Sequence, residues 1–340
     1  MPLLDMAVDA GDSVAASPPD RVKATGGTSD VSDTCEGVSM PAPRERNEEE
    51  PLHSLLARVT VLSGRELTIE PLDGGLTNRN YLVHADGEAY VVRVAGADTG
   101  LLGIDRDREV ACARAAAAAG VGPEVVAYLR EPQMLVTRFA PGELLEAASI
   151  RKSKTLRRVA EALRRCHDYP APAEAADFSL FAAVRRNHAL AQERHVPVSA
   201  ELDHALEVLA RIERDVRAGE PPCLCHNDLL PANLIDDGHR VWIIDWEFAG
   251  RGDRFFDLGN LAANGQFDEE RELLLLTAYF GEVRPQQLRR LKLMRLASDL
   301  REATWGYLQS AISSLHEPEY YRDYGRRHLA RFLAGSEQLV

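Results

Sequence analysis

Long hydrophobic runs are missing from this sequence of 340 residues. No apolar stretch approaches the roughly 20 residues that a membrane-spanning helix needs, so we predict a protein without a membrane span. The start, MPLLDMAVDAGDS, carries acidic residues where a secretory signal peptide has a basic region. The five cysteines are an odd number in a long chain, which gives no sign of a disulfide framework. These absences together predict a cytoplasmic protein in a reducing compartment.

An excess of positive charge is also absent. The formal net charge is −13, and residues 1–50, with eleven acids and four bases, carry −7 of it, which leaves −6 for the remaining chain. Broad affinity for nucleic acid needs clustered Lys and Arg, so this charge argues against a nucleic-acid partner. The charge is compatible with a cationic small substrate.

The composition changes near residue 51. Residues 1–50 are rich in Ser, Pro, Gly, Asp and Glu, and they cannot bury enough apolar surface to offset the entropy of ordering. We therefore predict a disordered acidic tail, with a docking segment as the alternative. Residues 51–140 are predicted to form a small β-rich lobe, and residues 141–340 a larger, mainly helical lobe. The predicted fold class is α+β.

Within the small lobe, hydrophobic periodicity and turn residues predict the order of the elements. An Asp-Gly pair at residues 86–87 between two β-rich runs is typical of a hairpin. The run DRDREVACARAAAAAG predicts a helix that stops at Gly120. The predicted elements are a helix over 52–59, three strands within 67–96, a helix over 105–120 and two strands within 123–142.

The stretch CLCHNDLLPANLIDDGHRVWIIDWE, residues 223–247, holds the densest polar chemistry. The spacing from His226 to Asp228 to Asn233 matches the catalytic-loop pattern H-x-D-x-x-x-x-N of protein kinases. Asp228 is predicted to accept the proton of a substrate hydroxyl. Asn233 and Asp245 supply the hard oxygen ligands that Mg²⁺ prefers. The runs PPCLC and RVWIID are predicted to pair as strands; the alternative is that these polar residues only end strands and turns.

His226 is predicted to support this loop through hydrogen bonds to the backbone. The alternative is a metal site that combines His226 with Cys223 and Cys225. C-x-C-H is not a common zinc spacing, and no second cluster of ligands is visible in the sequence. We therefore favour the structural interpretation of His226.

The cofactor-binding prediction for the small lobe starts from Arg93, which stands alone among valines in AYVVRVAG. It is predicted to bind ATP phosphates and to pair with Glu109, as a strand Lys pairs with a helix Glu in kinases; the alternative is an edge-strand Arg that reaches solvent. Arg binds phosphate with a planar, permanently charged fork. The other predicted cofactor contacts are Gly75, Thr77 and Asn78 in a glycine turn, and Thr137 and Phe139 beside the adenine.

Several of these segments together resemble one family, the choline/ethanolamine kinase branch of the aminoglycoside-phosphotransferase-like, kinase-fold superfamily. They are GGLTNRNY, VVRVAG, IDRDRE, VTRFAPGE, CHNDLLPANLI, IIDWEFAGRGDRFFDLGNLAAN and LREATWGYLQSAIS. The bacterial choline-kinase-like subgroup is the most similar. The resemblance implies a protein-kinase-like two-lobed fold, with a small antiparallel sheet and one helix in the nucleotide-binding N-lobe and the catalytic and substrate residues in the helical C-lobe.

The same resemblance implies ATP and Mg²⁺ as cofactors, Asp228 as the catalytic base, Asn233 and Asp245 as metal ligands and Asp257 as a buried brace of the catalytic loop. Protein kinases themselves fit less well. The loop has Asn227 where they have Arg, and no A-P-E segment closes an activation loop after Asp245.

The predicted substrate is a small alcohol that carries a cation, such as choline or ethanolamine. A quaternary ammonium group needs aromatic faces and a carboxylate nearby. Trp305, Tyr307 and Glu247 are the predicted contacts. Eukaryotic choline kinases place Glu about where Asn264 stands, which leaves the acceptor alcohol open. An aminoglycoside kinase, a thiamine-like kinase and a non-catalytic pseudokinase are the alternatives.

Overall fold

The computed structural model describes residues 51–72, 78–95, 103–217, 221–313 and 316–339. The predicted tail and two predicted cofactor contacts, Gly75 and Thr77, lie outside these ranges. The described chain falls into two units, residues 51–63 and the residues from Gly64 onward. The first unit contains helix α1 (Leu52–Ala57), where the sequence predicts a helix. Everything that follows concerns the second unit.

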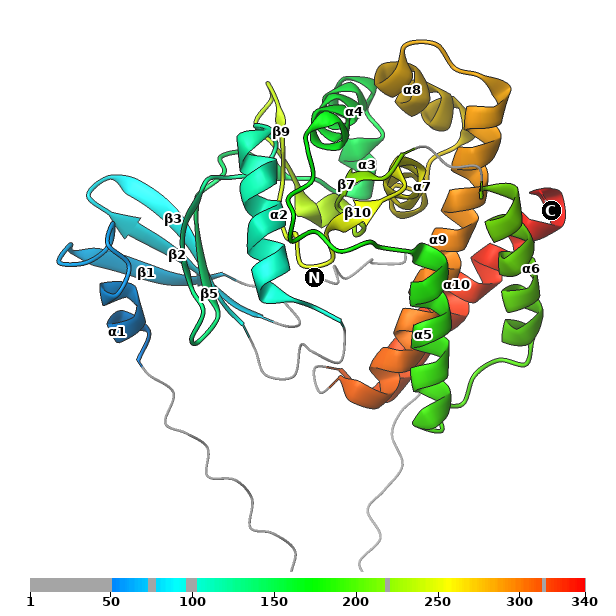
Figure 1. Ribbon diagram of the computed structural model, residues 1–340, viewed down its shortest axis with the longest axis horizontal. Coiled ribbons are helices and arrows are strands. Elements are labelled where there is room, and N and C mark those ends of the chain that lie inside the picture. Colours follow the sequence, from blue (N-terminus) through cyan, green and yellow to red (C-terminus); the bar gives the residue numbers. More distant parts are fainter. Residues whose placement is uncertain (1–50, 73–77, 96–102, 218–220, 314–315, 340) are drawn as a thin grey trace, which may run out of the picture. The chain divides into compact units, whose positions relative to one another are not determined.

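An antiparallel sheet of five strands, in the order β1-β2-β3-β5-β4, begins this unit (Figure 1). The Asp-Gly turn forms as predicted: Asp86 has φ +50° and Gly87 has φ +82°, the left-handed values that a tight hairpin between twisted strands requires. The strands are β1 (Leu67–Leu72), β2 (Asn78–Ala85), β3 (Glu88–Ala95), β4 (Val125–Leu129) and β5 (Met134–Arg138).

Helix α2 (Arg106–Ala118) connects β3 to β4 and lies beside the sheet in Figure 1. Its alanine-rich sequence favours the helix, and Asp105 caps it by accepting a hydrogen bond from the amide of Arg108 at 3.1 Å. Gly120, with φ +72°, takes the left-handed conformation that ends many helices. The helix therefore begins and ends close to the predicted residues.

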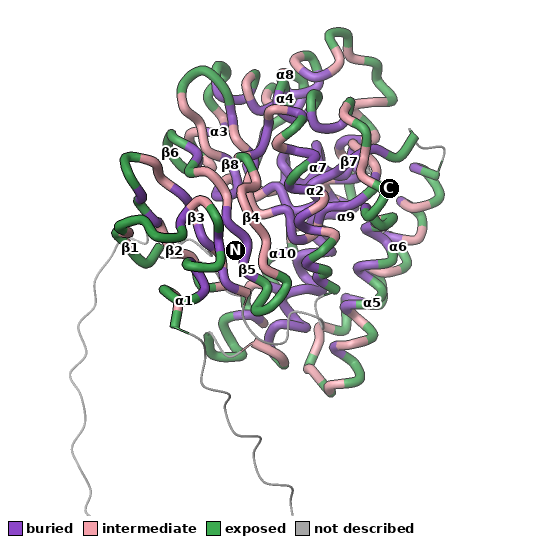
Figure 2. Tube along the Cα trace, turned by 60° about the vertical axis from the view of Figure 1, so that its left-hand side comes forward, coloured by how far each residue is buried: buried purple, intermediate pink, exposed green. Residues whose placement is uncertain are grey.

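The rest of the unit is mainly helical, as predicted. Helix α9 is its centre, because every residue from Leu296 to Ser310 is buried. Figure 2 shows this concentration of buried chain around α7 and α9. The helices are α3 (Ala147–Ile150), α4 (Ser153–Asp168), α5 (Leu180–Glu193), α6 (Glu201–Asp215), α7 (Arg254–Asn264), α8 (Glu269–Phe280), α9 (Pro285–Ile312) and α10 (Pro318–Leu339).

Two small sheets interrupt the helices, and their pairing corrects one prediction. The runs PPCLC and RVWIID do not pair with each other. Strand β9 pairs with β8 across a short turn, and β7 pairs with β10. The short turn makes closure of the β8–β9 hairpin cheap in entropy, so β9 takes its sequence neighbour as partner. The strands are β6 (Glu143–Leu144), β7 (Cys223–Cys225), β8 (Leu234–Asp236), β9 (Val241–Ile243) and β10 (Gly250–Gly252).

The segment that follows the five-stranded sheet enters the small sheet formed by β6, β8 and β9 within a few residues. Gly142 has φ +132°, and a Cβ there would lie 2.6 Å from the carbonyl oxygen of Asp236, so this position requires glycine. The next two residues form β6, which pairs with β8. The crossover between the sheet and the helical region therefore contacts the strand that follows the predicted catalytic loop.

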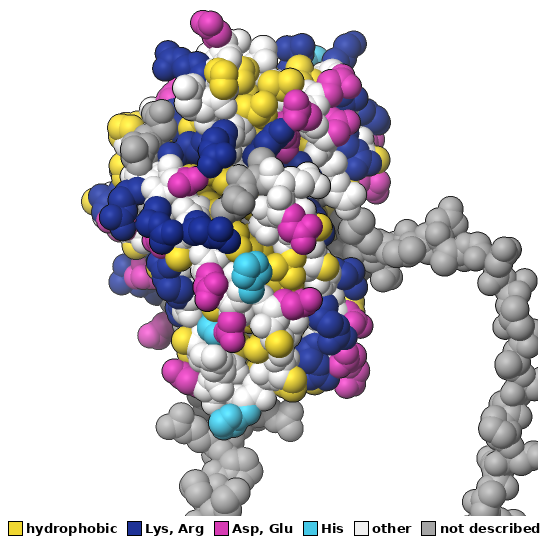
Figure 3. All heavy atoms as spheres, turned by 90° about the vertical axis from the view of Figure 1, so that its right-hand side faces the viewer, with side chains coloured by type: hydrophobic (Ala, Val, Ile, Leu, Met, Phe, Trp, Pro, Cys, Tyr) yellow, Lys and Arg dark blue, Asp and Glu magenta, His cyan; other side chains and the backbone are white. Residues whose placement is uncertain are grey.

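The surface carries charges of both signs. Figure 3 shows one face, on which Lys and Arg side chains lie interspersed with Asp and Glu. Ion pairs such as Arg289–Asp215 at 2.7 Å join neighbouring helices. Among the described helices, none is long and apolar enough to cross a membrane.

Candidate active site

The predicted catalytic loop runs from His226 at the end of β7 to Asn233 in a short 3-10 turn (Pro231–Asn233). The His226 ring spans the loop: Nε2 donates to the carbonyl of Ile244 at 2.9 Å, and Nδ1 accepts from the amide of Asp228 at 3.2 Å. The ring also packs edge-on against Trp246, with centroids 4.8 Å apart. His226 thus makes the backbone contacts expected of a residue that supports the loop.

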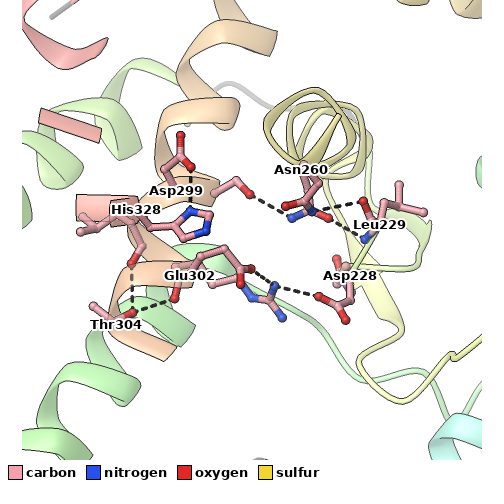
Figure 4. Close-up of polar contacts among 12 residues, drawn as sticks. Asp228, Leu229, Asn260, Asp299, Glu302, Thr304 and His328 are labelled. Atoms are coloured by element: carbon pink, nitrogen blue, oxygen red, sulfur yellow. Dashed lines mark hydrogen bonds and ion pairs between the residues drawn. The ribbon is translucent and has the colours of Figure 1, made fainter. Parts of the chain in front are cut away.

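Helix α7 holds the loop from behind. The buried carboxylate of Asp257 accepts hydrogen bonds from the amides of His226 and Asn227, both at 2.8 Å. One turn later, Asn260 accepts from the amide of Leu229 at 2.6 Å (Figure 4). These contacts satisfy three loop amides, which would otherwise be buried without partners. Asp257 has the position and the bonds of a brace.

Asp228 lies at the centre of this loop and is 2 % exposed. Burial raises the pKa of its carboxyl, and the guanidinium of Arg301 acts in the opposite direction. Arg301 Nη1 donates to Asp228 Oδ1 at 3.2 Å. Asn233 Nδ2 donates to the Asp228 carbonyl at 2.9 Å. This bond uses the amide nitrogen of Asn233, so the amide oxygen is the atom that could bind a cation.

Asp245 has φ +66°, a left-handed backbone that non-glycine residues adopt rarely. Its Oδ1 accepts from Arg93 Nη1 at 2.8 Å. Burial opposes ionisation of Asp245, but Arg93 and other cations outweigh it and lower the pKa. Arg93 also forms an ion pair with Glu109 of α2. One guanidinium from β3 therefore joins the helix of the small lobe to the carboxylate after β9.

A second buried arginine, Arg106, completes this cluster, and the sequence prediction missed it. Its Nη1 contacts Glu109 at 2.6 Å and Glu247 at 3.2 Å, and its Nη2 donates to Asn78 at 2.8 Å. Arg106 is three residues before Glu109 in a helix, so both lie on one face, and this spacing is the signal that could have identified it. Burial and the Asp245 charge raise the pKa of Glu247, against the influence of the two arginines.

A cavity of about 470 Å³ opens beside these groups. Most of its wall is apolar, from residues such as Val91, Leu135 and Trp246. The predicted residues that line it are Asn78, Arg93, Glu109, Thr137, Phe139, Asn233 and Asp245. A largely apolar cavity with a few converging polar groups is the usual form of a small-molecule site.

Two backbone amides at the cavity edge already form hydrogen bonds within the protein. The amide of Phe139 donates to Ala89 at 3.0 Å, and the amide of Arg138 donates to Glu124 at 2.9 Å. These two N–H groups are therefore not free to meet an adenine edge. The side chains of Thr137 and Phe139 still line the cavity.

The two predicted aromatic contacts on α9 have different environments. Trp305 packs edge-on against Tyr321 and Tyr324 of α10, with centroids 6.1 and 5.7 Å apart. Tyr307 is 2 % exposed and belongs to the main hydrophobic core. Residues two apart on a helix point to different sides, which explains the difference. The structure thus places Tyr307 in the main core and Trp305 at the contact between α9 and α10.

Trp305 also lies one helical turn from a buried polar chain that starts at Asp228, the predicted base. Arg301 contacts both Asp228 and Glu302, the two carboxylates labelled in Figure 4. Glu302 also accepts from the hydroxyl of Tyr324 at 2.7 Å. Arg301 and Glu302 are two further site residues that the sequence prediction did not assign. They lie in LREATWGYLQSAIS, one of the segments that carry the family resemblance, and this was the available signal.

The chain is similar in sequence to known proteins. Residues 68–293 match the family described as phosphotransferase enzyme family. Protein LicA of Haemophilus influenzae is 24% identical over 269 residues, which cover 75% of this chain and 76% of LicA. A probable ethanolamine kinase A of Dictyostelium discoideum is 27% identical over 310 residues, covering 81% of this chain and 87% of the relative.

Among solved structures, a choline/ethanolamine kinase family protein from Mesorhizobium loti superposes with a TM-score of 0.71 at 29% identity, covering 84% of this chain and 98% of that chain. The predicted α+β kinase-like fold is confirmed by this similarity, and the resemblance to choline and ethanolamine kinases is confirmed by the named relatives. The match over residues 68–293 shows that the chain belongs to the phosphotransferase enzyme family.

Proposed function

We propose that this protein is an ATP- and Mg²⁺-dependent O-phosphotransferase that phosphorylates the hydroxyl of an amino alcohol such as choline or ethanolamine. The observation that carries the proposal is the convergence of Arg93, Asn233 and Asp245 on one cavity, with the buried Asp228 in the same loop as Asn233. The names of the relatives support the class of acceptor.

The donor set fits Mg²⁺. The amide oxygen of Asn233 and the carboxylate of Asp245 are hard oxygen ligands, and both residues line the cavity. Mg²⁺ uses few protein ligands and shares its remaining positions with phosphates and water. When bound, the ion neutralises charge on the phosphates and orients them.

The cavity also fits a nucleotide. Apolar side chains from β3 and β5 form the wall against which a base can pack, and Arg93 provides a guanidinium at the polar end. Glu109 and Asp245 hold that guanidinium from two sides. A fixed planar fork binds phosphate oxygens with little loss of side-chain entropy.

Asp228 is assigned the role of general base, which takes the proton from the acceptor hydroxyl. Its backbone is fixed by the bonds around it: its own amide to His226, and those of the neighbouring loop residues to Asp257 and Asn260. Arg301 holds one carboxylate oxygen and opposes the effect of burial on the pKa. Arg301 therefore orients the carboxylate of Asp228 and favours its ionised form.

The test is an ATP-consumption screen over choline, ethanolamine, thiamine and an aminoglycoside, with Asp228→Asn as the paired variant. We expect turnover with an amino alcohol, and a loss of about 10²–10⁴-fold in the variant, the usual contribution of a general base. ATP binding by the variant should be retained. Turnover with the aminoglycoside alone would replace the proposed acceptor class, and ATP binding without turnover on any alcohol would indicate a pseudokinase.

A further inference from the structure

A cluster of soft ligands lies behind the catalytic loop and has no part in the proposed reaction. Cys223 and Cys225 occupy alternate positions of β7, so both thiols project from the same face of the strand. Their sulfur atoms are 3.6 Å apart. A ring nitrogen of His167, from α4, and the two sulfurs all lie within 4.8 Å of one another, and all three residues are buried.

The neighbouring strand has a glycine opposite each of the two cysteines. Strand β10 places Gly250 opposite Cys225 and Gly252 opposite Cys223. Cys166 is not part of the cluster, and its thiol donates to the carbonyl of Leu224 at 3.4 Å. The cluster therefore offers two sulfurs and one imidazole.

The hydrogen bonds of His167 prepare its ring to bind a cation. Nε2 donates to the carboxylate of Asp257 at 3.0 Å, and Nδ1 accepts from the hydroxyl of Tyr279 at 2.7 Å. Nδ1 thus carries the lone pair, and only one hydroxyl must move for a cation to take it. A histidine ligand that donates its other N–H to a carboxylate is the common arrangement around protein-bound metals.

We propose that His167, Cys223 and Cys225 form a binding site for a thiophilic d¹⁰ cation such as Zn²⁺ or Cd²⁺. Two thiolates and an imidazole select such ions over Mg²⁺, which prefers oxygen ligands. With Zn–S bonds of about 2.3 Å, tetrahedral geometry separates two sulfurs by about 3.8 Å. The observed separation of 3.6 Å needs almost no adjustment.

The pKa values of the two thiols shift in opposite directions. The hydrogen bond from Cys225 lowers the pKa of Cys223 to about 7, although burial acts in the opposite direction. Burial, together with the bond to Cys223, raises the pKa of Cys225. The metal-site alternative raised by the sequence combined these cysteines with His226, but the His226 ring is bound to Ile244, and His167 stands at the cluster instead.

The position of the site connects it to the catalytic loop. Asp257, which binds His167, also accepts the amides of His226 and Asn227. A bound cation would join α4 to β7 and fix the imidazole that Asp257 uses. Because the cation binds the folded state, it should raise the melting temperature.

The experiment titrates the reduced, full-length protein with Cd²⁺ and Zn²⁺. We expect one Cd²⁺ per chain to produce the ultraviolet sulfur-to-cadmium charge-transfer absorbance, and both ions to raise the melting temperature. Cys223→Ser and Cys225→Ser should each reduce the absorbance and abolish the rise. Cys112→Ser, which changes another buried free cysteine on α2, should retain both effects.

The absorbance separates this site from the oxygen ligands proposed for Mg²⁺, because only thiolate ligands produce it. X-ray absorption of the cadmium complex provides a second measurement, with two sulfur neighbours expected. If Cys225→Ser does not fold, the test depends on Cys223→Ser and on the number of sulfur neighbours of cadmium in the wild-type protein. Absence of stoichiometric thiolate binding in the wild-type protein, or its persistence in Cys223→Ser, would overturn the proposal.

Discussion

Arg301 of α9 donates a hydrogen bond to the carboxylate of Asp228 across 3.2 Å, and both side chains are buried. The same guanidinium nitrogen contacts Glu302 at 2.8 Å. One cation thus serves two buried carboxylates, of which one is the proposed base. A buried charge without its partner is costly, so the activity and the stability of the site should both depend on Arg301.

Replacing Arg301 with Met should shift the acidic limb of the pH profile of kcat/KM to higher pH. Burial already raises the pKa of Asp228, and Arg301 lowers it. Loss of the guanidinium raises this pKa further, and activity is lost as the pH falls through it. Stability should drop by about 3–5 kcal/mol, the usual effect of breaking a buried ion pair. Arg301→Lys retains the positive charge, so its acidic limb should move less. An acidic limb that does not move in Arg301→Met would contradict the assignment of Asp228 as the base.

Asp245→Ala should weaken the dependence of turnover on Mg²⁺ and lower ATP affinity. The change removes a proposed oxygen ligand and one of the two carboxylates that hold Arg93. Isothermal titration with Mg·ATP, together with rates measured across Mg²⁺ concentrations, checks this. Asp203→Ala, at an exposed position of α6, is the matched control and should behave like the wild type. Identical Mg²⁺ curves for both variants would refute the role of Asp245.

Asp257→Asn should reduce turnover and destabilise the loop while cavity residues remain in place. The amide side chain cannot accept from two loop N–H groups and from His167 as the carboxylate does. Leaving a buried donor unsatisfied costs about 1–3 kcal/mol. Hydrogen exchange at the amides of His226 and Asn227 should accelerate. Unchanged exchange at both amides would show that the loop does not depend on this brace.

Trp305→Leu should raise the KM for the acceptor alcohol and leave the KM for ATP unchanged. A cation–π contact of about 1–2 kcal/mol corresponds to about a 5–30-fold change. Tyr307→Phe is the control, because Tyr307 lies in the main core and not beside the polar chain from Asp228. If both variants keep the wild-type KM for the acceptor, Trp305 is a packing residue only.

Local sequence patterns predicted most of the fold. The Asp-Gly hairpin, the alanine-rich helix that ends before Gly120 and the strand with Arg93 each depend on neighbouring residues. The spacing of His226, Asp228 and Asn233 is likewise local, because one loop carries all three. Such features are set by backbone preference and periodicity, which the sequence displays directly.

Features that depend on which distant segments meet could not be predicted in the same way. Strand β7 was predicted to pair with the run that contains β9, and it pairs with β10 instead. Arg106 and Arg301 each have one carboxylate partner nearby in the sequence, but the partners that bring them into the site, Glu247 and Asp228, come from other parts of the chain. His167 reaches Cys223 from a helix more than fifty residues earlier, and no spacing rule connects the two.

The pairing of β6 with β8 has a mechanical consequence. The chain bends at Gly142, where only glycine fits, and the residues immediately after it are hydrogen-bonded to the strand that follows Asn233. The segment that joins the sheet to the helices is thus hydrogen-bonded to the strand that directly follows the loop with the proposed magnesium ligand. A displacement of the five-stranded sheet relative to the helices would therefore also displace this loop. Movement of the proposed nucleotide-binding residues and alignment of the loop would be coupled.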